Sequence, residues 1–186
     1  MIDLENLMVR EARLTKGPLG EDFFLEHILV VKTIALDLAK DLDADVTIVD
    51  AAALLHDIAA VRDYRGIANH HIEGAAIVRG LLAGENYPSA MIEAVCECIE
   101  RHSAPIAMGE GSPEAVCLSN ADALAQMLRP VYWLYYAFRV KNFSFTEGSA
   151  WYRSRMESHM ALLIPRAALV YGKIYEPIYA SLYGKK

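Results

Sequence analysis

The sequence predicts an all-α fold, a single helical bundle that continues into further helices at its C-terminal end. Two observations carry this prediction. Apolar residues recur at three- and four-residue steps in one segment after another, which is the period of a helix with one buried face. We find no convincing strand, since no segment keeps the strict apolar–polar alternation that marks one. The length of 186 residues suits one domain with its own core, so we expect a single all-α domain over residues 1–186.

Five helices are predicted in the first 102 residues, separated by short segments that hold Gly, Pro or charged residues. They are expected at residues 2–14, 21–40, from 47 onwards, 70–82 and 89–102. The third helix is predicted from a capping box at Thr47–Asp50, followed by Ala51–Leu55, which is apolar on most faces. A helix without a polar face is usually central in its bundle, and we expect the same here.

The second half of the chain is also predicted to be helical. A loop over 103–113 contains two Pro and two Gly, and Ser112 near its end is a good N-cap before a Pro at the first helical position. The helix that follows is expected to stop near residue 130. Further helices are expected over 130–180, interrupted by a polar loop at 142–148 and by Pro165.

The charge balance restricts the partners of the protein. Lys and Arg number 18 and Asp and Glu number 24, so the net charge is −6. This charge argues against a nucleic-acid polymer or an acidic membrane surface as partner, because both require an excess of Lys and Arg. A small phosphorylated substrate stays compatible with it, because a bound metal ion can reverse the local field.

The cysteines and the N-terminus predict a cytoplasmic protein. The three cysteines, Cys96, Cys98 and Cys117, are odd in number and lack zinc-finger spacing, so we interpret them as reduced, mostly buried thiols. The N-terminal segment has no basic start followed by an apolar run, as a signal peptide would. No apolar run approaches the ~18 residues that a membrane-spanning helix needs.

Histidines and aspartates carry the chemistry that the sequence suggests. The doublet His56-Asp57 follows a very apolar stretch, where a carboxylate without a partner would be costly. A divalent cation offsets that cost and uses the imidazole lone pair. His27, His102 and Asp122 fall on the apolar faces of other predicted helices, and such ligands from several helices suit a metal site in a bundle. Mixed imidazole and carboxylate ligands favour Fe, Mn, Co, Ni or Zn over calcium.

A single core-facing histidine is more often a structural residue, so the order of the whole set matters. The set runs His27, then Leu55-His56-Asp57-Ile58, then His70-His71-Ile72-Glu73-Gly74-Ala75, then Arg101-His102-Ser103, then Asn120-Ala121-Asp122-Ala123. This order strongly resembles the HD superfamily of metal-dependent phosphohydrolases, over about residues 21–128. His159 has no companion ligand, and we interpret it as a surface or helix-face residue.

The resemblance implies a ligand set and a reaction. One metal ion would be held by His27, His56, Asp57 and Asp122. A second would be held by His102 and by His70 or His71, with His70 preferred for its spacing to Gly74 and with Asp57 as the bridge. The cofactor would therefore be one or two divalent transition metals per chain. The resemblance also implies that Asp57, His70 and His102 take part in catalysis.

The implied reaction is metal-assisted hydrolysis, in which a water with its pKa lowered toward ~7 attacks phosphorus. A positive side chain would help to hold the phosphate. We expect Lys32, Arg62 and Arg65 to bind the substrate in this way, with the two arginines ranked first because they follow the doublet in a loop. Ser103, Ser119 and Asn120 are polar neighbours of the implied ligands and suit supporting roles.

Two other functions remain open on the sequence. The same six-ligand pattern serves related di-iron oxygenases, and a ligand-binding or regulatory HD domain could keep the metal with little turnover. The substrate is not identified beyond a nucleotide or another small phosphate ester. The aromatic segment Tyr132–Tyr136 has three interpretations: packed core, a stacking surface for a base, or a contact between the subunits of a homodimer.

Overall fold

The computed structural model describes residues 2–184, and every regular element in that range is helical. The first group of helices is α1 (Leu4–Leu14), α2 (Glu21–Phe23), α3 (Leu29–Leu42), α4 (Val46–Leu55), α5 (Ile58–Arg62), α6 (His70–Gly84), α7 (Ser89–Arg101) and α8 (Pro113–Leu128). The second group is α9 (Pro130–Tyr135), α10 (Phe145–Leu162) and α11 (Pro165–Tyr183). The predicted all-α fold is therefore confirmed.

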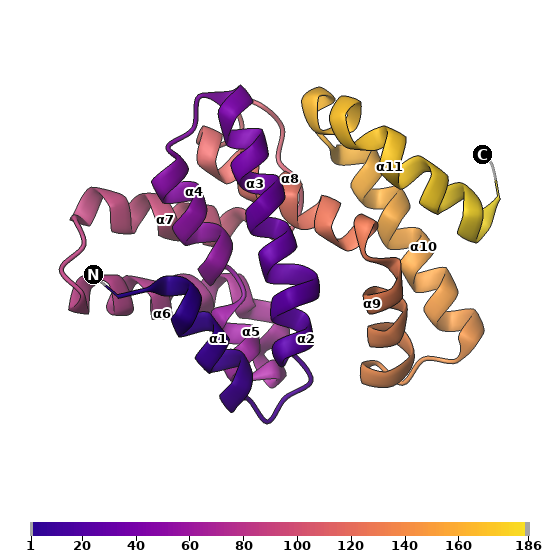
Figure 1. Cartoon of the computed structure of the whole chain (residues 1–186), viewed down its shortest axis with the longest axis horizontal. Coiled ribbons are helices and arrows are strands. Elements are labelled where there is room, and N and C mark those ends of the chain that lie inside the picture. The colour runs from indigo at the N-terminus through magenta and orange to yellow at the C-terminus, as the bar shows by residue number, and fades with distance from the viewer. Residues whose placement is uncertain (1, 185–186) are drawn as a thin grey trace.

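Helix α8 is the centre of the arrangement. Every residue from Ala115 to Met127 is buried, because helices α3, α4 and α7 pack against it on one part and α10 and α11 on another. Figure 1 shows α9–α11 as a separate group, in orange and yellow, which joins the rest of the molecule through α8. Alanines make up much of α8 and α4, and their small side chains let neighbouring helices approach closely. The site residue Asp122 lies on this central helix.

Side-chain caps mark the starts of α4 and α8, and the cap predicted for α4 is wrong. Ser112 caps α8 as predicted, since its side chain accepts a hydrogen bond from the backbone N–H of Ala115. The capping box predicted at Thr47–Asp50 is absent. Asp45 is the N-cap of α4 instead, and its carboxylate accepts from the backbone N–H of Thr47. The helix consequently starts at Val46, one residue before the predicted start.

The helix predicted over 21–40 is not a regular α-helix. Its first part is a short α-helical turn, residues Phe24–Ile28 form a π-helical turn, and only from Leu29 does the regular helix α3 run on. A second π-helical turn, Tyr136–Val140, follows α9. Such turns carry one extra residue and shift the direction of the side chains that follow, and they are frequent at functional sites.

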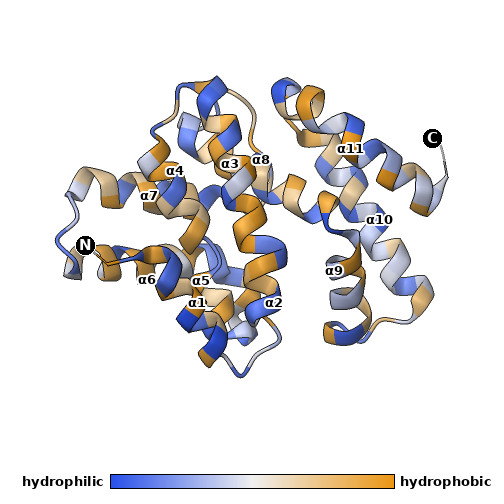
Figure 2. Ribbon diagram, in the orientation of Figure 1, coloured by the Kyte–Doolittle hydropathy of each residue, from blue (hydrophilic) through white to orange (hydrophobic). Residues whose placement is uncertain are grey.

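The C-terminal helices α9–α11 expose apolar side chains. Val131, Phe145 and Leu169 are each more than three-quarters exposed, and apolar and polar residues alternate along α11 (Figure 2). Nothing in the structure shows what covers these side chains, so the homodimer stays a prediction, as does the single-domain assignment. None of the helices within residues 2–184 combines the length and the apolar character that crossing a membrane requires.

Candidate metal centre

The π-helical turn Phe24–Ile28 places His27 in the interior. Its imidazole is 1% exposed and lies between the rings of Phe23 and Trp133, with centroids at 4.8 and 5.2 Å. Its Nε2 is 3.1 Å from Oδ1 of Asp122 on α8. Its Nδ1 is buried, and none of the described residues gives that atom a hydrogen-bond partner. Packing between two aromatic rings therefore fixes the orientation of His27.

The His-Asp doublet lies at a break between two helices. Helix α4 ends at Leu55, His56 is its C-cap, and Asp57 leaves the helical conformation with φ −106° and ψ 15° before α5 begins. Side chains of adjacent residues on a regular helix diverge by about 100°. The break removes that constraint, so both side chains point to one place: His56 Nε2 is 3.3 Å from Asp57 Oδ2. The sequence predicted the doublet within a helix and missed the break.

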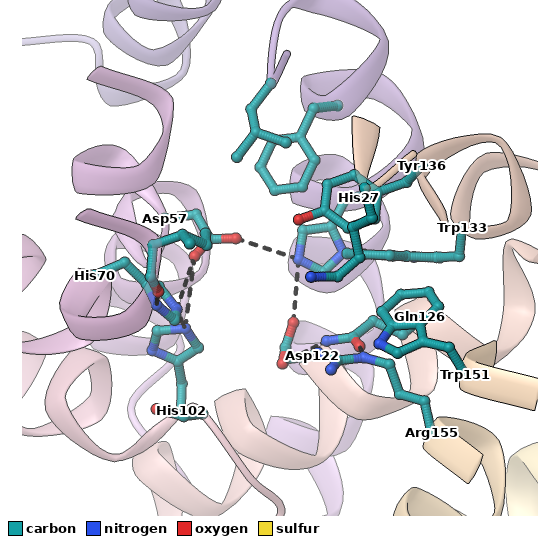
Figure 3. A pocket seen from close by; sticks show the side chains of 15 residues that line it. His27, Asp57, His70, His102, Asp122, Gln126, Trp133, Tyr136, Trp151 and Arg155 are labelled. Atoms are coloured by element: carbon teal, nitrogen blue, oxygen red, sulfur yellow. Dashed lines mark hydrogen bonds and ion pairs between the residues drawn. The ribbon is translucent and has the colours of Figure 1, made fainter. Parts of the chain in front are cut away.

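Asp57 contacts imidazoles through both of its carboxylate oxygens. Oδ2 lies 3.5 Å from Nε2 of His27 and 3.3 Å from Nε2 of His56. Oδ1 lies 3.2 Å from Nε2 of His70 and 3.7 Å from Nε2 of His102. Figure 3 shows Asp57 between His27 on one side and the pair His70 and His102 on the other. The carboxylate therefore joins two groups of nitrogen atoms, and each group with Asp57 has atoms close enough to hold one ion.

Backbone carbonyls orient three of the four imidazoles. Nδ1 donates to the carbonyl oxygen three residues earlier in His56 (2.8 Å), His70 (2.7 Å) and His102 (2.6 Å). A carbonyl oxygen cannot donate, so Nδ1 carries the proton and Nε2 of a neutral ring presents a lone pair. His70 Nε2 and His102 Nε2 face each other at 3.0 Å, so two lone pairs meet there. Only a cation between them, a proton or a metal ion, makes that contact favourable.

The spacing of the ligand atoms fits a transition-metal ion. Zn²⁺ and similar ions bind nitrogen and oxygen at about 2.0–2.2 Å, so neighbouring ligand atoms in a tetrahedral or octahedral shell are separated by about 3.0–3.5 Å. The nitrogen–nitrogen separations here are 3.3 Å for His27 and His56 and 3.0 Å for His70 and His102. Both groups match that range, and their donor set of imidazoles and carboxylates suits Fe, Mn, Co, Ni or Zn.

The buried carboxylates of Asp57 and Asp122 are held in their ionised form. Burial by itself would raise the pKa of the Asp57 carboxyl, but the facing imidazoles, His56 above all, hold that pKa well below its usual range. The pKa of Asp122 is likewise lowered, since its hydrogen bond with His27 outweighs the effect of burial. Burial lowers the pKa of His27, but Asp122 and Asp57 outweigh burial and raise it to about 9. Two ionised carboxylates thus share a water-poor site, which a divalent ion can neutralise.

Asp122 is held by a hydrogen-bond chain that the sequence did not reveal. Gln126, one turn later on α8, donates from Nε2 to Oδ2 of Asp122 at 2.9 Å. The amide oxygen of Gln126 accepts from Nε2 of His159 at 3.2 Å and from Nε of Arg155. His159 is 7% exposed, so its interpretation as a surface residue is wrong. The four-residue spacing of Arg155 and His159, which puts both on one helix face, was the signal for this contact.

The cluster opens into a pocket with a volume of about 270 Å³. Asp57, His70, His102 and Asp122 line one part of it, together with Ser103. Leu19, Phe23 and Ile67 add apolar surface, and the C-terminal part of the chain supplies Trp133, Tyr136, Lys141, Trp151 and Arg155. In the view of Figure 3, Arg155 and Trp151 lie on the side of Asp122 away from His70. In the aromatic segment, Tyr132 is packed in the core, as one of the three interpretations expected. Trp133 and Tyr136 are also buried, but they form part of the pocket wall.

The structure does not bring all the predicted site residues to this pocket. Lys32 contacts Glu5 and Asp50 in a different surface hollow. Arg62 pairs with Glu11 and Arg65 with Asp63, and neither arginine lines the pocket.

Of the two adjacent histidines, His70 faces Asp57. His71 lies beside it with ring centroids 5.5 Å apart, but it belongs to neither group of candidate ligands. Its Nδ1 is buried and has no hydrogen-bond partner in the described part of the chain. Ser119 and Asn120 serve the loop that precedes α8, because they hydrogen-bond to the backbone of Ile106.

Comparison with known proteins gives one sequence relative and two related folds. Over 99 residues the chain is 35% identical to the tRNA (cytidine(56)-2'-O)-methyltransferase of Thermoplasma volcanium; the match covers 53% of this chain but only 25% of that protein. The structure resembles a predicted HD superfamily hydrolase from an uncultured Thermotogales bacterium, with TM-score 0.57, 21% identity, and coverage of 85% of this chain and 83% of the other. It also resembles Bacillus subtilis YpgQ, whose crystal structure is a complex with ADP, with TM-score 0.67, 15% identity, and coverage of 96% and 93%.

At these identities the two structures show a common fold. The family assignment comes from the sequence itself, because the model of the HD domain family matches residues 24–127, which is more than half of the chain and includes every candidate ligand described above. The chain belongs to the HD domain family.

Proposed function

We propose that the protein is a metal-dependent phosphohydrolase that acts on a nucleotide or another small phosphate ester. The observation that carries the proposal is the Asp57 carboxylate, whose two oxygens face two separate pairs of imidazole nitrogens beside an open pocket. Similarity to a predicted HD superfamily hydrolase and to a protein bound to ADP supports the choice of reaction and substrate class. The net charge of −6 favours a small phosphorylated compound over a nucleic-acid polymer.

Two divalent ions are proposed as the cofactor. One would be held by His27, His56, Asp57 and Asp122, and the other by Asp57, His70 and His102. When bound, such ions supply Lewis acidity toward phosphoryl oxygens and a water that is deprotonated near neutral pH. The chain's own residues keep the site ready for this chemistry. Backbone carbonyls hold Nδ1–H of three histidines, so their Nε2 lone pairs stay directed inward.

The wall of the pocket performs the remaining tasks. Trp133 packs against His27 and Tyr136 packs against Trp133. Both line the pocket and limit the access of bulk water, which strengthens the electrostatic interactions inside. The hydroxyl groups of Tyr136 and Tyr64 hydrogen-bond at 2.5 Å, and this bond ties the C-terminal helices to the segment that precedes His70. Positive charge for the phosphate comes from the C-terminal helices rather than from Lys32, Arg62 or Arg65.

Metal analysis and a substrate panel test the proposal. Protein purified without chelators is analysed for metal, then assayed with Mn²⁺, Co²⁺ or Ni²⁺ against phosphomonoesters, phosphodiesters and nucleotides. Asp57→Ala should abolish release of phosphate or nucleotide while the helical circular dichroism signal stays. Asp63→Ala, which removes an exposed carboxylate six residues later, is the matched control and should keep full activity.

Each alternative function has its own result in the same experiment. Bound metal with no turnover on any member of the panel would indicate a regulatory HD domain. A requirement for iron together with oxygen consumption would indicate a di-iron oxygenase. Full activity of Asp57→Ala, or the absence of bound metal, would reject the proposed function.

A further inference from the structure

Two cations of the pocket wall lack a carboxylate partner. Across residues 2–184 most Lys and Arg side chains form an ion pair with Asp or Glu, including Arg13, Lys32, Arg62, Arg79 and Arg166. Six form none within the same range; of these, Lys141 and Arg155 line the pocket, whereas Arg10, Lys16, Arg139 and Lys173 do not. Positive charge is scarce in this protein, whose net charge is −6. Two unpaired cations at one pocket therefore require an explanation.

Arg155 is held in place without using its full hydrogen-bonding capacity. Its guanidinium lies 5.8 Å from the ring centroid of Trp133 and 5.6 Å from that of Trp151, so two indole faces restrict it. Its Nε donates to Gln126, the residue that also donates to Asp122. The four hydrogens on its terminal nitrogens have no acceptor in the described part of the chain. Arg155 is thus linked to Asp122, a proposed metal ligand, through Gln126. The N–H groups of its two terminal nitrogens, which form a fork, remain available to a ligand.

Lys141 is exposed and lines the same wall. Its ammonium is 5.9 Å from the ring centroid of Tyr136, 5.6 Å from that of Phe143 and 5.9 Å from that of Trp151. Arg155 and Lys141 therefore share the ring of Trp151 as a neighbour. The two charges lie at different depths in one pocket, with Arg155 partly buried and Lys141 exposed.

The carboxylates of the site do not account for these cations. Asp57 and Asp122 already face imidazoles and, in the proposed function, two divalent ions. A single phosphoryl group at the proposed metal ions would contact at most the partly buried Arg155. Lys141, which is exposed, matches a further anionic group of the substrate, such as a second phosphate joined to the first through a bridging oxygen.

We propose that Arg155 and Lys141 bind a second phosphate group, so that the substrate class is a compound with a diphosphate or triphosphate chain rather than a monophosphate. Arg155 binds the phosphate next to the reacting one through its free fork. Lys141 neutralises the charge at the mouth of the pocket as a point charge. This inference rests on the proposed function and adds the substrate class to it.

Binding of a hydrolysis-resistant probe tests the inference separately from turnover. Imidodiphosphate, in which nitrogen replaces the bridging oxygen, and orthophosphate are titrated by calorimetry into the manganese-loaded full chain. The only two tryptophans of the chain, Trp133 and Trp151, both line the pocket, so their fluorescence reports whether binding occurs there. Wild-type protein should bind imidodiphosphate more tightly than orthophosphate.

Matched variants assign the effect to the two cations. Arg155→Gln should weaken imidodiphosphate binding about tenfold or more, the loss expected for a hydrogen-bonded charge pair. Lys141→Gln should weaken it about threefold to fivefold, the loss expected for an exposed charge. Lys141→Gln should leave orthophosphate binding within twofold of wild type. Arg153→Gln on the same helix and Arg139→Gln near Lys141 remove exposed cations outside the pocket, and both should bind like wild type. Arg155→Lys keeps the charge but loses the fork, and it serves if Arg155→Gln fails to fold.

Defined results overturn the inference. Imidodiphosphate binding within twofold of wild type in both Gln variants would exclude a role for these cations. An equal loss of orthophosphate and imidodiphosphate affinity in Lys141→Gln would show a site for one phosphate only. A negative substrate panel combined with cation-dependent imidodiphosphate binding would reject the proposed hydrolysis and keep the anion site, so the two failures are distinguishable.

Discussion

Gln126→Leu should weaken both the fold and the metal site, because one buried amide supports three partners. The side chain is 3% exposed, donates to Oδ2 of Asp122 at 2.9 Å, and accepts from His159 and Arg155. Leucine has a similar volume and no polar atoms. The substitution therefore removes three hydrogen bonds without opening a large cavity.

The size of the effect follows from the partners left behind. A buried polar group without a partner costs about 1–3 kcal/mol. Two such groups result, Oδ2 of Asp122 and Nε2 of His159, whereas Arg155 is partly exposed and regains water. Burial of the added leucine surface offsets about 1 kcal/mol. The free energy of unfolding of the metal-free protein should thus fall by about 1–5 kcal/mol. Loss of the residue that orients a metal ligand should also lower metal affinity about 10- to 100-fold.

Urea unfolding in the presence of a chelator measures the first effect, and competition with a chromophoric chelator measures the second. Asn120→Leu is the matched control on the same helix. Asn120 is fully buried and makes three hydrogen bonds, to Ile106, Val116 and Ile164, but none to a candidate ligand. It should lose comparable stability and keep its metal affinity. Equal metal affinity of Gln126→Leu and Asn120→Leu would refute the role given to Gln126.

Two further predictions concern metal content and packing. His70→Ala and His102→Ala should each lower bound metal from two equivalents toward one by elemental analysis, whereas His71→Ala should not; two equivalents in all three variants would reject the second metal position. Gly148→Ala should destabilise the protein by about 1–3 kcal/mol in urea unfolding, because the new Cβ would lie 2.7 Å from Cδ1 of Phe138. Gly80→Ala, at an open position within α6, should instead stabilise by about 0.5–1 kcal/mol, and a loss of stability there would contradict the packing argument.

Helical periodicity was sufficient to predict the main helices, but not their irregular parts. The period of apolar residues reports which face is buried, so it located α6, α7 and α8 within a few residues. It carries no information on a single inserted residue. The π-helical turn that places His27 and the helix break at Asp57 were therefore missed. Both depend on contacts between distant segments, which local sequence does not encode.

The structure brings together the predicted ligands, which had a sequence context, but not the charged residues predicted around them. Lys32 and Arg62 were chosen because they follow His27 and Asp57 closely in the chain. Closeness in the chain did not bring them to the pocket, because Lys32 pairs with Glu5 and Asp50 and Arg62 pairs with Glu11. The cations that do reach the pocket, Lys141 and Arg155, are more than 100 residues from His27 in sequence. No pattern near the ligands could have indicated them.

The candidate ligands and the cations of the pocket wall come from two different parts of the chain, so metal binding and substrate selectivity depend on different segments. Every candidate ligand precedes residue 123, and the tryptophans and cations of the wall all follow residue 132. Substitutions after Pro130 can change the pocket wall without replacing any candidate ligand. A chimaera that keeps residues 1–128 and exchanges the remaining helices, but retains Trp133, which packs on His27, and Arg155 and His159, which hydrogen-bond to Gln126, should therefore keep the candidate ligands oriented and acquire a different selectivity. The junction at Arg129-Pro130, where α8 ends and α9 begins, is the natural position for that exchange.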